Sequence, residues 1–457
     1  MTKIFIDTLG CAKNEYDSQV LSADLEERGC AIVLDPEEAD VLIVNTCGFI
    51  DDAKRESIEH IFEMAELKGE SKKLVVTGCL SQRYHDELVE EMPEVDMFFG
   101  VNDYDVIPDI LSSLEKGDGL LSQELEGPSP GSGLSLLDKN PKKTVPDWKL
   151  PYRKRMFKKG VYSDVLKIAE GCNNACAFCA IPAIRGPYRS KSIEDCVREA
   201  KDMAEAGVKE LVLIAQDTSQ YGKDMYGKIM LPELLTELCK IDGIEWIRLQ
   251  YVYDNGITDE LIEVMKNEPK ICNYLDIPIQ HIADNVLNGM KRRSSGKSIR
   301  ATIKKLRDSI PDIHIRTTLL VGFPGETEED IEELLDFIDE TKIDRLGAFA
   351  FSDEEGTASY DLPGKLDEET KQERRNMVME HQLAVSEELN ARKIGSVQEV
   401  MIDEIADENL YIGRTRYDAP DIDCEVTVKT EIKHRPGDII QVKITDSYEY
   451  DLEGVEV

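Results

Sequence analysis

The feature that most constrains the fold is an alternation of apolar strand patterns with amphipathic helix patterns between about residues 163 and 350. This order favours parallel strands joined by crossover helices. Six consecutive βα units predict a parallel barrel or an open partial barrel, with the active site at the carboxyl ends of the strands. The six strand patterns cover residues 164–171, 210–217, 246–253, 274–281, 313–323 and 345–352.

Two further regions flank this predicted barrel. The first, at residues 1–110, has four strand patterns with helical patterns between them, which predicts a small parallel α/β sheet. The last, after about residue 394, has short alternating runs typical of a small all-β barrel. The predicted fold class is therefore α/β with an all-β end. The predicted boundaries are an N-terminal α/β domain at 1–116, a linker at 117–157, a partial βα (TIM-like) barrel at 158–392 and the small barrel at 393–457.

Composition limits the cellular compartment in which such a chain can work. None of its apolar runs reaches the roughly 18 residues that cross a bilayer, and the start "MTKIFIDTLG" lacks the pattern of an export signal. We therefore predict a cytoplasmic protein with no membrane partner. In that compartment, eleven cysteines favour thiolates used as ligands over disulfides.

The charge is strongly acidic, at −37 overall. Residues 1–110 hold 26 acidic and 9 basic residues, and residues 394–457 hold 16 and 6. Such a surface repels a polyanion and attracts a basic partner, although acidity alone can also serve solubility. The run at 139–160 is strongly basic, and it fits either a solvated linker or a local patch for an acidic substrate or cofactor.

The stretch "KIAEGCNNACAFCAIP" carries three cysteines, Cys172, Cys176 and Cys179, directly after the first barrel strand. Thiolates at these offsets can bind three corners of an iron–sulfur cubane and leave one iron open for a small molecule. A structural zinc or inert core thiols are the alternatives. Zinc would need a fourth ligand nearby, and the next cysteine, Cys196, lies in a helical pattern.

A second trio, Cys11, Cys47 and Cys79, lies in the first region, and each member directly follows a strand pattern. The carboxyl ends of parallel strands share one edge of a sheet, where ligands bind. Gly10, Gly48 and Gly78 flank the trio and permit tight turns. This arrangement fits a second cluster, and it also fits three ordinary buried cysteines. We expect packing roles for His281 and for the remaining cysteines, which are Cys30, Cys196, Cys239, Cys272 and Cys424.

The CxxxCxxC motif, with Phe178 before its last cysteine, resembles that of the radical S-adenosylmethionine enzymes. The resemblance implies a 4Fe-4S cluster whose open iron binds S-adenosylmethionine. Cleavage by one electron then yields a radical that abstracts hydrogen from an unactivated carbon. A non-catalytic iron–sulfur electron carrier is a competing interpretation, but it would need neither the barrel nor the terminal β-domain.

With the first trio and the terminal barrel included, the whole chain resembles the methylthiotransferases. The resemblance implies a second 4Fe-4S cluster on Cys11, Cys47 and Cys79 that supplies the sulfur, and a TRAM domain at the end. In the implied chemistry, one S-adenosylmethionine methylates the sulfur and a second generates the radical. The sulfur donor and the electron donor would be external.

Two methylthiotransferase subfamilies compete. The MiaB type modifies an adenosine in tRNA, and the RimO type modifies an aspartate β-carbon of the decoding-centre protein of the small ribosomal subunit. Stretches such as "AQDTSQYGKD", "RRSSGKSIR" and "GRTRYDAPDID" resemble the RimO type. The acidic terminal barrel also suits a basic ribosomal protein, free or in the ribosome, better than tRNA.

Supporting residues for the cofactor are suggested by position alone. Gln216 and Asp217 end the second barrel strand and could hold polar groups of S-adenosylmethionine. Gly322 and Gly325, in "VGFPGE", end the fifth strand and could let the adenine approach the backbone. Turn formation and capping are the competing explanation for all four. The sequence identifies no catalytic acid or base.

Overall fold

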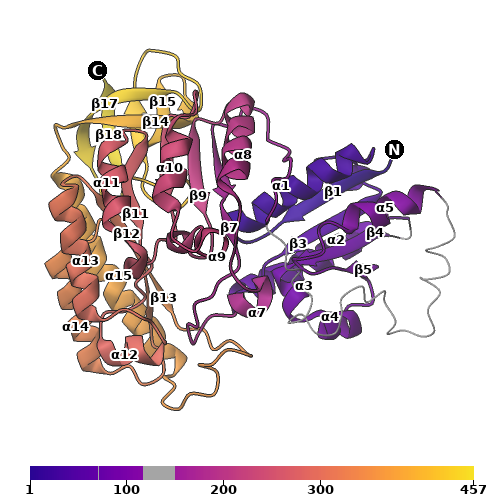
Figure 1. Ribbon diagram of the computed structural model, residues 1–457, viewed down its shortest axis with the longest axis horizontal. Helices are drawn as coiled ribbons and strands as arrows, with labels where there is room; N and C mark the ends of the chain where they lie inside the picture. The colour runs from indigo at the N-terminus through magenta and orange to yellow at the C-terminus, as the bar shows by residue number, and fades with distance from the viewer. Residues whose placement is uncertain (70, 117–149) are drawn as a thin grey trace. The chain divides into compact units, whose positions relative to one another are not determined.

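The computed structural model describes residues 1–69, 71–116 and 150–457. The chain forms two compact units (Figure 1). The first comprises Met1–Phe157, Glu170–Asn174 and Cys179–Arg189, and the second comprises Lys158–Ala169, Ala175–Phe178 and Ser190–Val457. Most of the linker predicted at 117–157 lies outside the described residues. Its described end belongs to the first unit.

The first unit contains a five-stranded parallel sheet in the order β2-β1-β3-β4-β5. The central strand β3 is buried along its whole length, as expected for a parallel strand covered on both faces. The strands are β1 (Lys3–Thr8), β2 (Ala31–Ile32), β3 (Val41–Thr46), β4 (Lys73–Gly78) and β5 (Met97–Phe98). The predicted small parallel α/β sheet is confirmed.

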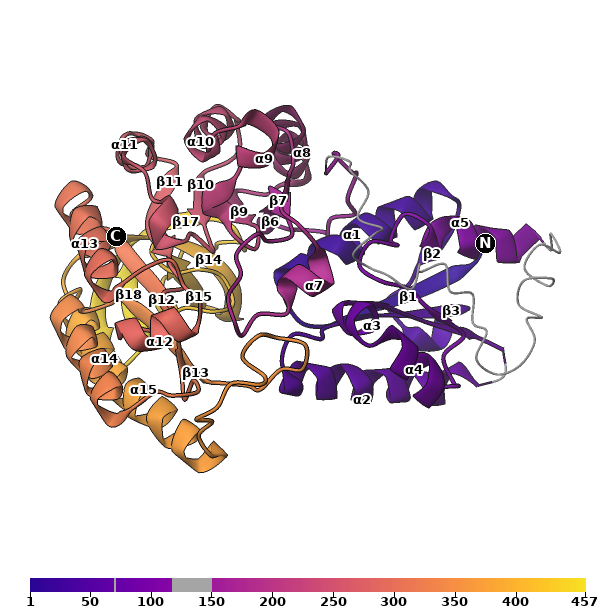
Figure 2. The ribbon, with the colours of Figure 1, turned by 60° about the horizontal axis from the view of Figure 1, so that its bottom comes forward.

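Helices cover both faces of this sheet, as Figure 2 shows. One core includes Leu21 of α1, Ile107 of α5 and Ile184 of α7. The core on the other face includes Ile61 of α2 and Leu88 of α4. The helices are α1 (Ala12–Glu27), α2 (Asp51–Lys68), α3 (Cys79–Arg83), α4 (His85–Glu91), α5 (Ile107–Lys116) and α7 (Ile181–Arg185).

The described end of the basic run packs back onto the first unit. Arg155 is buried, donates to Gln19 Oε1 at 2.8 Å and lies 4.8 Å from the Tyr16 ring centroid. Arg153 pairs with Asp24 of α1. These cations therefore neutralise and cover α1, a role that neither interpretation of the basic run anticipated.

The second unit is built on a six-stranded parallel sheet in the order β13-β12-β11-β10-β9-β6. The order follows the chain, and β6 and β13 are edges, so the sheet is an open partial barrel. Its strands are β6 (Ser163–Lys167), β9 (Glu210–Ile214), β10 (Trp246–Leu249), β11 (Ile271–Asp276), β12 (His314–Val321) and β13 (Arg345–Ala350). The short strands β7 (Ala169–Glu170) and β8 (Arg189–Ser190) lie before and after α7 in the chain.

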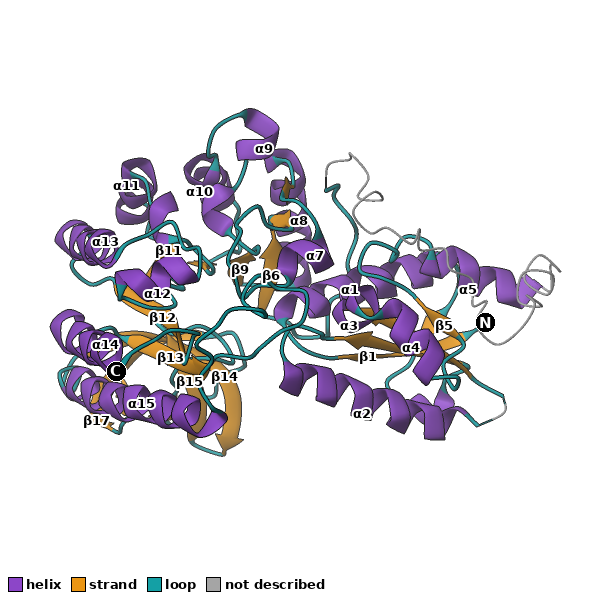
Figure 3. Cartoon of the chain, turned by 90° about the horizontal axis from the view of Figure 1, so that it is seen from below, coloured by secondary structure: helices purple, strands orange, loops and turns teal. Residues whose placement is uncertain are grey.

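Crossover helices return the chain between these strands (Figure 3). Several begin at a hydroxyl or carboxylate cap, such as Ser192, Thr258, Ser295 and Thr327, each of which accepts a backbone N–H. The helices are α8 (Ile193–Ala206), α9 (Lys223–Tyr226), α10 (Leu231–Cys239), α11 (Asp259–Asn267), α12 (Asp284–Gly289), α13 (Gly296–Ser309), α14 (Glu328–Thr341) and α15 (Glu368–Ala391).

The chain ends in a closed barrel in the order β14-β15-β16-β18-β17, and this confirms the predicted all-β end. Its interior is aliphatic, with Val400, Val426 and Val442 among the buried side chains. The barrel belongs to the second unit, and its residues Met401 and Ala419 pack with Trp246, Cys272 and Tyr274. The strands are β14 (Val397–Asp407), β15 (Leu410–Thr415), β16 (Val426–Lys429), β17 (Ile439–Ser447) and β18 (Leu452–Glu456).

Candidate iron–sulfur centres

The first trio lies at the carboxyl edge of the first sheet. Residues pair in register at this edge, Thr8 with Asn45 and Thr46 with Gly78. Cys11 immediately precedes α1, Cys47 follows β3, and Cys79 opens α3. The aligned strand ends therefore deliver three thiols from distant parts of the sequence to one place, as parallel topology predicts.

Electrostatics show that the three thiols are close neighbours. Burial raises the pKa of Cys47, and a thiolate at Cys11 raises it further. Burial also raises the pKa of Cys79 to about 11, with smaller contributions from Cys11 and Cys47. Burial therefore disfavours the thiolate forms of Cys47 and Cys79, and positive charge, such as iron provides, would favour them.

Two glycines permit this convergence. A Cβ on Gly10 would lie 2.9 Å from Cys47 Sγ, and Gly10 has a φ of +89°. A Cβ on Gly48 would lie 2.6 Å from Leu80 Cα. Larger residues at these positions would push the three cysteine loops apart.

Asn14 fixes the loops that carry the thiols, and it was not among the residues predicted from the sequence. It is fully buried, and its Nδ2 donates to Leu9 O at 2.8 Å and to Thr46 O at 3.0 Å. One side chain thus holds the chain just before Cys11 and just before Cys47. Its position in the first turn of α1 is the only sequence signal that points to it.

Arg185 was also missed, although it follows the radical motif closely. Its Nη2 lies 3.4 Å from Cys79 Sγ and donates to Asn14 Oδ1 at 2.6 Å. Its Nη1 donates to Asp17 Oδ2 at 2.7 Å and lies 3.3 Å from Glu170 Oε2. A buried guanidinium therefore faces the first trio.

The CxxxCxxC motif occupies the loop between β7 and α7. In the first unit, the backbone N–H of Cys172 donates to Gly186 O at 3.1 Å, and Asn174 N lies 3.4 Å from Cys172 Sγ. Cys179 belongs to the same unit. In the second unit, Arg292 Nη1 lies 3.6 Å from Cys176 Sγ.

The loop segment that carries Cys176 is anchored in the second unit. Ala177 N–H donates to Met290 O, and Ala177 O accepts from Ser359 N–H, both at 2.9 Å. Phe178 packs against a core that includes Phe323 and Phe351. The aromatic before the last cysteine therefore holds the loop by apolar packing.

The donor chemistry of the first trio, three cysteine thiols, fits an iron–sulfur cluster. Within residues 1–69, 71–116 and 150–457, no group of three or more His, Cys, Asp or Glu side chains has the geometry of a single-ion site. Zinc needs ligands that converge on one point, whereas the thiolates of a cubane each bind a different iron. Cysteine thiolates are the ligands that iron–sulfur clusters take.

The residues predicted to support the cofactor have structural contacts. Asp217 is buried and accepts a hydrogen bond from the Ser219 hydroxyl at 2.5 Å in the turn after β9, which Gln216 also enters. At Gly322, a Cβ would lie 2.5 Å from Lys371 Cγ, and at Gly325 it would meet open space. Roles toward S-adenosylmethionine stay predictions for all four.

His281 has contacts within the second unit. It is fully buried, and its Nδ1 accepts from the backbone N–H of Ala283 at 3.1 Å. The proton therefore lies on Nε2, which faces Glu326 Oε2 at 3.5 Å. Glu326 in turn accepts from Gly322 N–H at 2.9 Å and from Arg374 at 2.8 Å, so His281 belongs to a network that holds the loop after β12.

Three family models match the chain. Residues 3–100 match the uncharacterized protein family UPF0004, residues 166–338 match the radical SAM superfamily, and residues 394–457 match the TRAM domain. The chain is 47% identical over 456 residues to a ribosomal protein uS12 methylthiotransferase RimO of Clostridioides difficile, covering 99% of this chain and 98% of that protein. A RimO of Thermoanaerobacter is 46% identical over 99% of this chain and 100% of its own length.

The chain belongs to the RimO family of ribosomal protein uS12 methylthiotransferases. It is a radical SAM methylthiotransferase, the predicted enzyme class. The three-part fold class is confirmed, and the RimO type is favoured over the MiaB type.

Solved structures agree on the fold. The radical S-adenosylmethionine methyltransferase TsrM from Kitasatospora setae, at 16% identity, aligns with a TM-score of 0.58 over 76% of this chain and 73% of its own. The cobalamin-dependent radical enzyme OxsB, at 12% identity, aligns with a TM-score of 0.53 over 84% and 58%. Among the described residues, the helices are too short or too polar to cross a membrane.

Proposed function

We propose that this chain attaches a methylthio group to the β-carbon of an aspartate in ribosomal protein uS12. Cys11, Cys47 and Cys79 would hold one 4Fe-4S cluster, and Cys172, Cys176 and Cys179 would hold another that binds S-adenosylmethionine. The observation that carries the proposal is the meeting of the first trio at the edge of a separate sheet. That trio supplies a second thiolate site beyond the one that a radical SAM motif requires.

The bound groups would supply the electron, the hydrogen-abstracting radical and the sulfur. The chain's own residues orient and seclude them. Asn14 and the close approaches at Gly10 and Gly48 hold the first trio. Arg292 and the apolar packing around Phe178 hold the loop segment of Cys176. Gln216, Asp217, Gly322 and Gly325 are our candidates for contacts with S-adenosylmethionine.

The charge distribution supports a basic protein substrate. The net charge of −37 includes many acidic residues in the terminal barrel, which suits a basic ribosomal protein and opposes tRNA. The substrate would be met free or within the small subunit in the cytoplasm. An external electron donor and a sulfur donor complete the proposed partners.

The test offers both candidate substrates to anaerobically reconstituted enzyme. The enzyme is incubated with S-adenosylmethionine, a reductant, a sulfide source and either uS12, small subunits or tRNA. We expect the mass of a methylthio group on an aspartate of uS12 and 5′-deoxyadenosine in solution. Modification of tRNA alone would overturn the proposal, and the absence of 5′-deoxyadenosine would favour a simple electron carrier.

A Cys176→Ser variant tests the ligand assignment in this assay, and Cys196→Ser is its matched control. Cys176→Ser should lose both products, whereas Cys196→Ser should keep both, because Cys196 is a buried residue of α8 that belongs to neither predicted ligand set. Equal loss in both variants would point to a folding defect rather than a missing ligand.

A further inference from the structure

Arg185 joins the segment after the radical motif to the first trio. It ends α7, six residues after Cys179, and its side chain is 3% exposed. Segment Cys179–Arg189 packs within the first unit. The same short segment therefore carries one predicted ligand of one cluster and a cation that faces a predicted ligand of the other.

The geometry directs this cation at sulfur. Nη2 lies 3.4 Å from Cys79 Sγ, within the range of an N–H···S hydrogen bond. The guanidinium also donates to Asn14 Oδ1, Asp17 Oδ2 and Glu170 Oε2, and these contacts hold its orientation. Burial, the larger effect, raises the pKa of Cys47, whereas the charge of Arg185 also acts on that pKa and lowers it.

Hydrogen bonds and positive charge at cluster sulfurs stabilise the reduced, more negative state. A guanidinium keeps its charge at any working pH, so this stabilisation is permanent. We propose that Arg185 is a positioning residue that raises the reduction potential of the cluster held by Cys11, Cys47 and Cys79. This inference rests on the proposed function, because it needs that cluster.

Asp17 provides a negative charge that opposes the positive charge of Arg185. Its carboxylate holds Nη1 of Arg185 and is 5% exposed. Its negative charge offsets part of the guanidinium field at the trio. Removal of the charge on Arg185 should therefore lower the potential, and removal of the charge on Asp17 should raise it. A residue that only supports the fold would not produce shifts of opposite sign.

The experiment isolates the first cluster in the full-length chain. In a background with Cys172, Cys176 and Cys179 all changed to Ala, the cluster is reduced stepwise with dithionite and followed by electron paramagnetic resonance. Arg185→Gln keeps a donor and loses the charge, Arg185→Lys keeps the charge, and Asp17→Asn removes the partner's charge. Arg28→Gln is the control, because Arg28 pairs with Asp109 on the surface of the same unit.

We expect Arg185→Gln to lower the reduced-to-oxidised ratio at fixed potential at least tenfold, which for one electron is about 59 mV. Arg185→Lys should stay within about threefold of the background, Asp17→Asn should shift the ratio the opposite way, and Arg28→Gln should change nothing. Unchanged potentials in Arg185→Gln and Asp17→Asn, or shifts of the same sign, would overturn the inference.

Loss of the cluster is also informative. If Arg185→Gln retains no cluster, the reduction potentials of Arg185→Lys and Asp17→Asn test the inference instead. An unchanged potential in Asp17→Asn overturns it. If the background variant itself binds no cluster, the proposed function fails instead. The two failures are thus distinguished by iron content before any potential is measured.

Discussion

At the scale of single residues, the candidate site depends on a few buried polar side chains that hold the predicted sulfur ligands in place. The six cysteines were predicted as ligands from the sequence because thiols at strand ends and in a dense motif carry a chemical signature. Asn14 and Arg185 were not, since asparagine and arginine occur throughout any chain. Their importance comes from contacts such as Asn14 with Thr46, 32 residues apart, which only the fold creates.

Cys47 provides the direct residue-scale test of the first cluster. Reconstituted wild-type chain should hold about eight irons, and Cys47→Ser should hold about four, because a cubane with two protein ligands is poorly retained. Iron analysis and visible absorbance measure this. Cys30→Ser, in the same domain core, should keep full iron content, and an equal loss there would refute the ligand assignment.

Glu210 tests the buried ion pairs of the second unit. It is fully buried and accepts from Arg248 Nε at 2.8 Å and from Arg414 of the terminal barrel. Glu210→Gln leaves two buried cations under-compensated and should cost about 3–5 kcal/mol of unfolding free energy. Denaturant titration measures the loss. The exposed Glu245→Gln should change stability by less than about 0.5 kcal/mol.

At the scale of elements, the sequence predicted strand and helix order well because apolar periodicity records burial directly. The three cysteines of the first trio were placed correctly after their strands. Short elements were missed, such as β2, α7 and α12, because two to six residues carry no readable period.

The loop after β12 offers an element-scale prediction through its two glycines. Both have positive φ, +77° at Gly322 and +86° at Gly325. Alanine should cost about 1 kcal/mol at Gly325, where only the backbone is strained. At Gly322 the added Cβ also meets Lys371 of α15, so the cost should exceed that by about 1–3 kcal/mol. Thermal or denaturant unfolding compares the two alanine variants. Equal losses of unfolding free energy would show that Lys371 of α15 moves aside at little cost.

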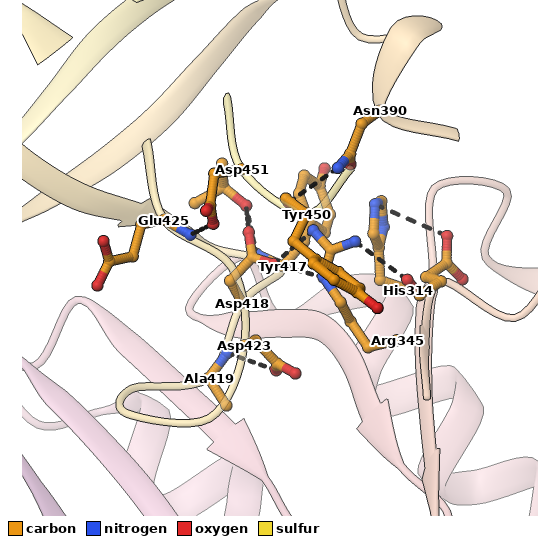
Figure 4. Close-up of polar contacts among 12 residues, drawn as sticks. His314, Arg345, Asn390, Tyr417, Asp418, Ala419, Asp423, Glu425, Tyr450 and Asp451 are labelled. Carbon is orange, nitrogen blue, oxygen red and sulfur yellow. Dashed lines mark hydrogen bonds and ion pairs between the residues drawn. The ribbon is translucent and has the colours of Figure 1, made fainter. Parts of the chain in front are cut away.

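At the scale of the whole molecule, the second unit joins the partial barrel to the terminal barrel through ion pairs and stacking. Arg345 of β13 contacts Asp418 at 2.7 Å, and the His314 ring stacks on Tyr417 at 4.1 Å (Figure 4). Sequence patterns predicted two separate domains here. They could not predict the seam, because its partners lie about 70 to 100 residues apart and their pairing depends on tertiary packing.

Asp418 gives this seam a defined response to acid. Arg345 opposes the large burial cost and holds the pKa of Asp418 well below its usual 3.8. A carboxyl group with a depressed folded pKa stabilises the protein above its unfolded pKa, and that stability is lost as the pH falls further. The unfolding free energy should therefore decrease below about pH 4. Asp403 titrates in a separate pH range, because burial raises its pKa to about 6.

The measurement is denaturant unfolding between pH 5 and pH 3, followed by circular dichroism. Asp418→Asn should be less stable than wild type by about 3 kcal/mol at pH 5, since Arg345 loses its buried partner, and the gap should shrink toward pH 3. The exposed Asp421→Asn should run parallel to wild type throughout. If Asp418→Asn also runs parallel, the buried ion pair does not set the acid response, and the two barrels are joined chiefly by the apolar cluster around Trp246.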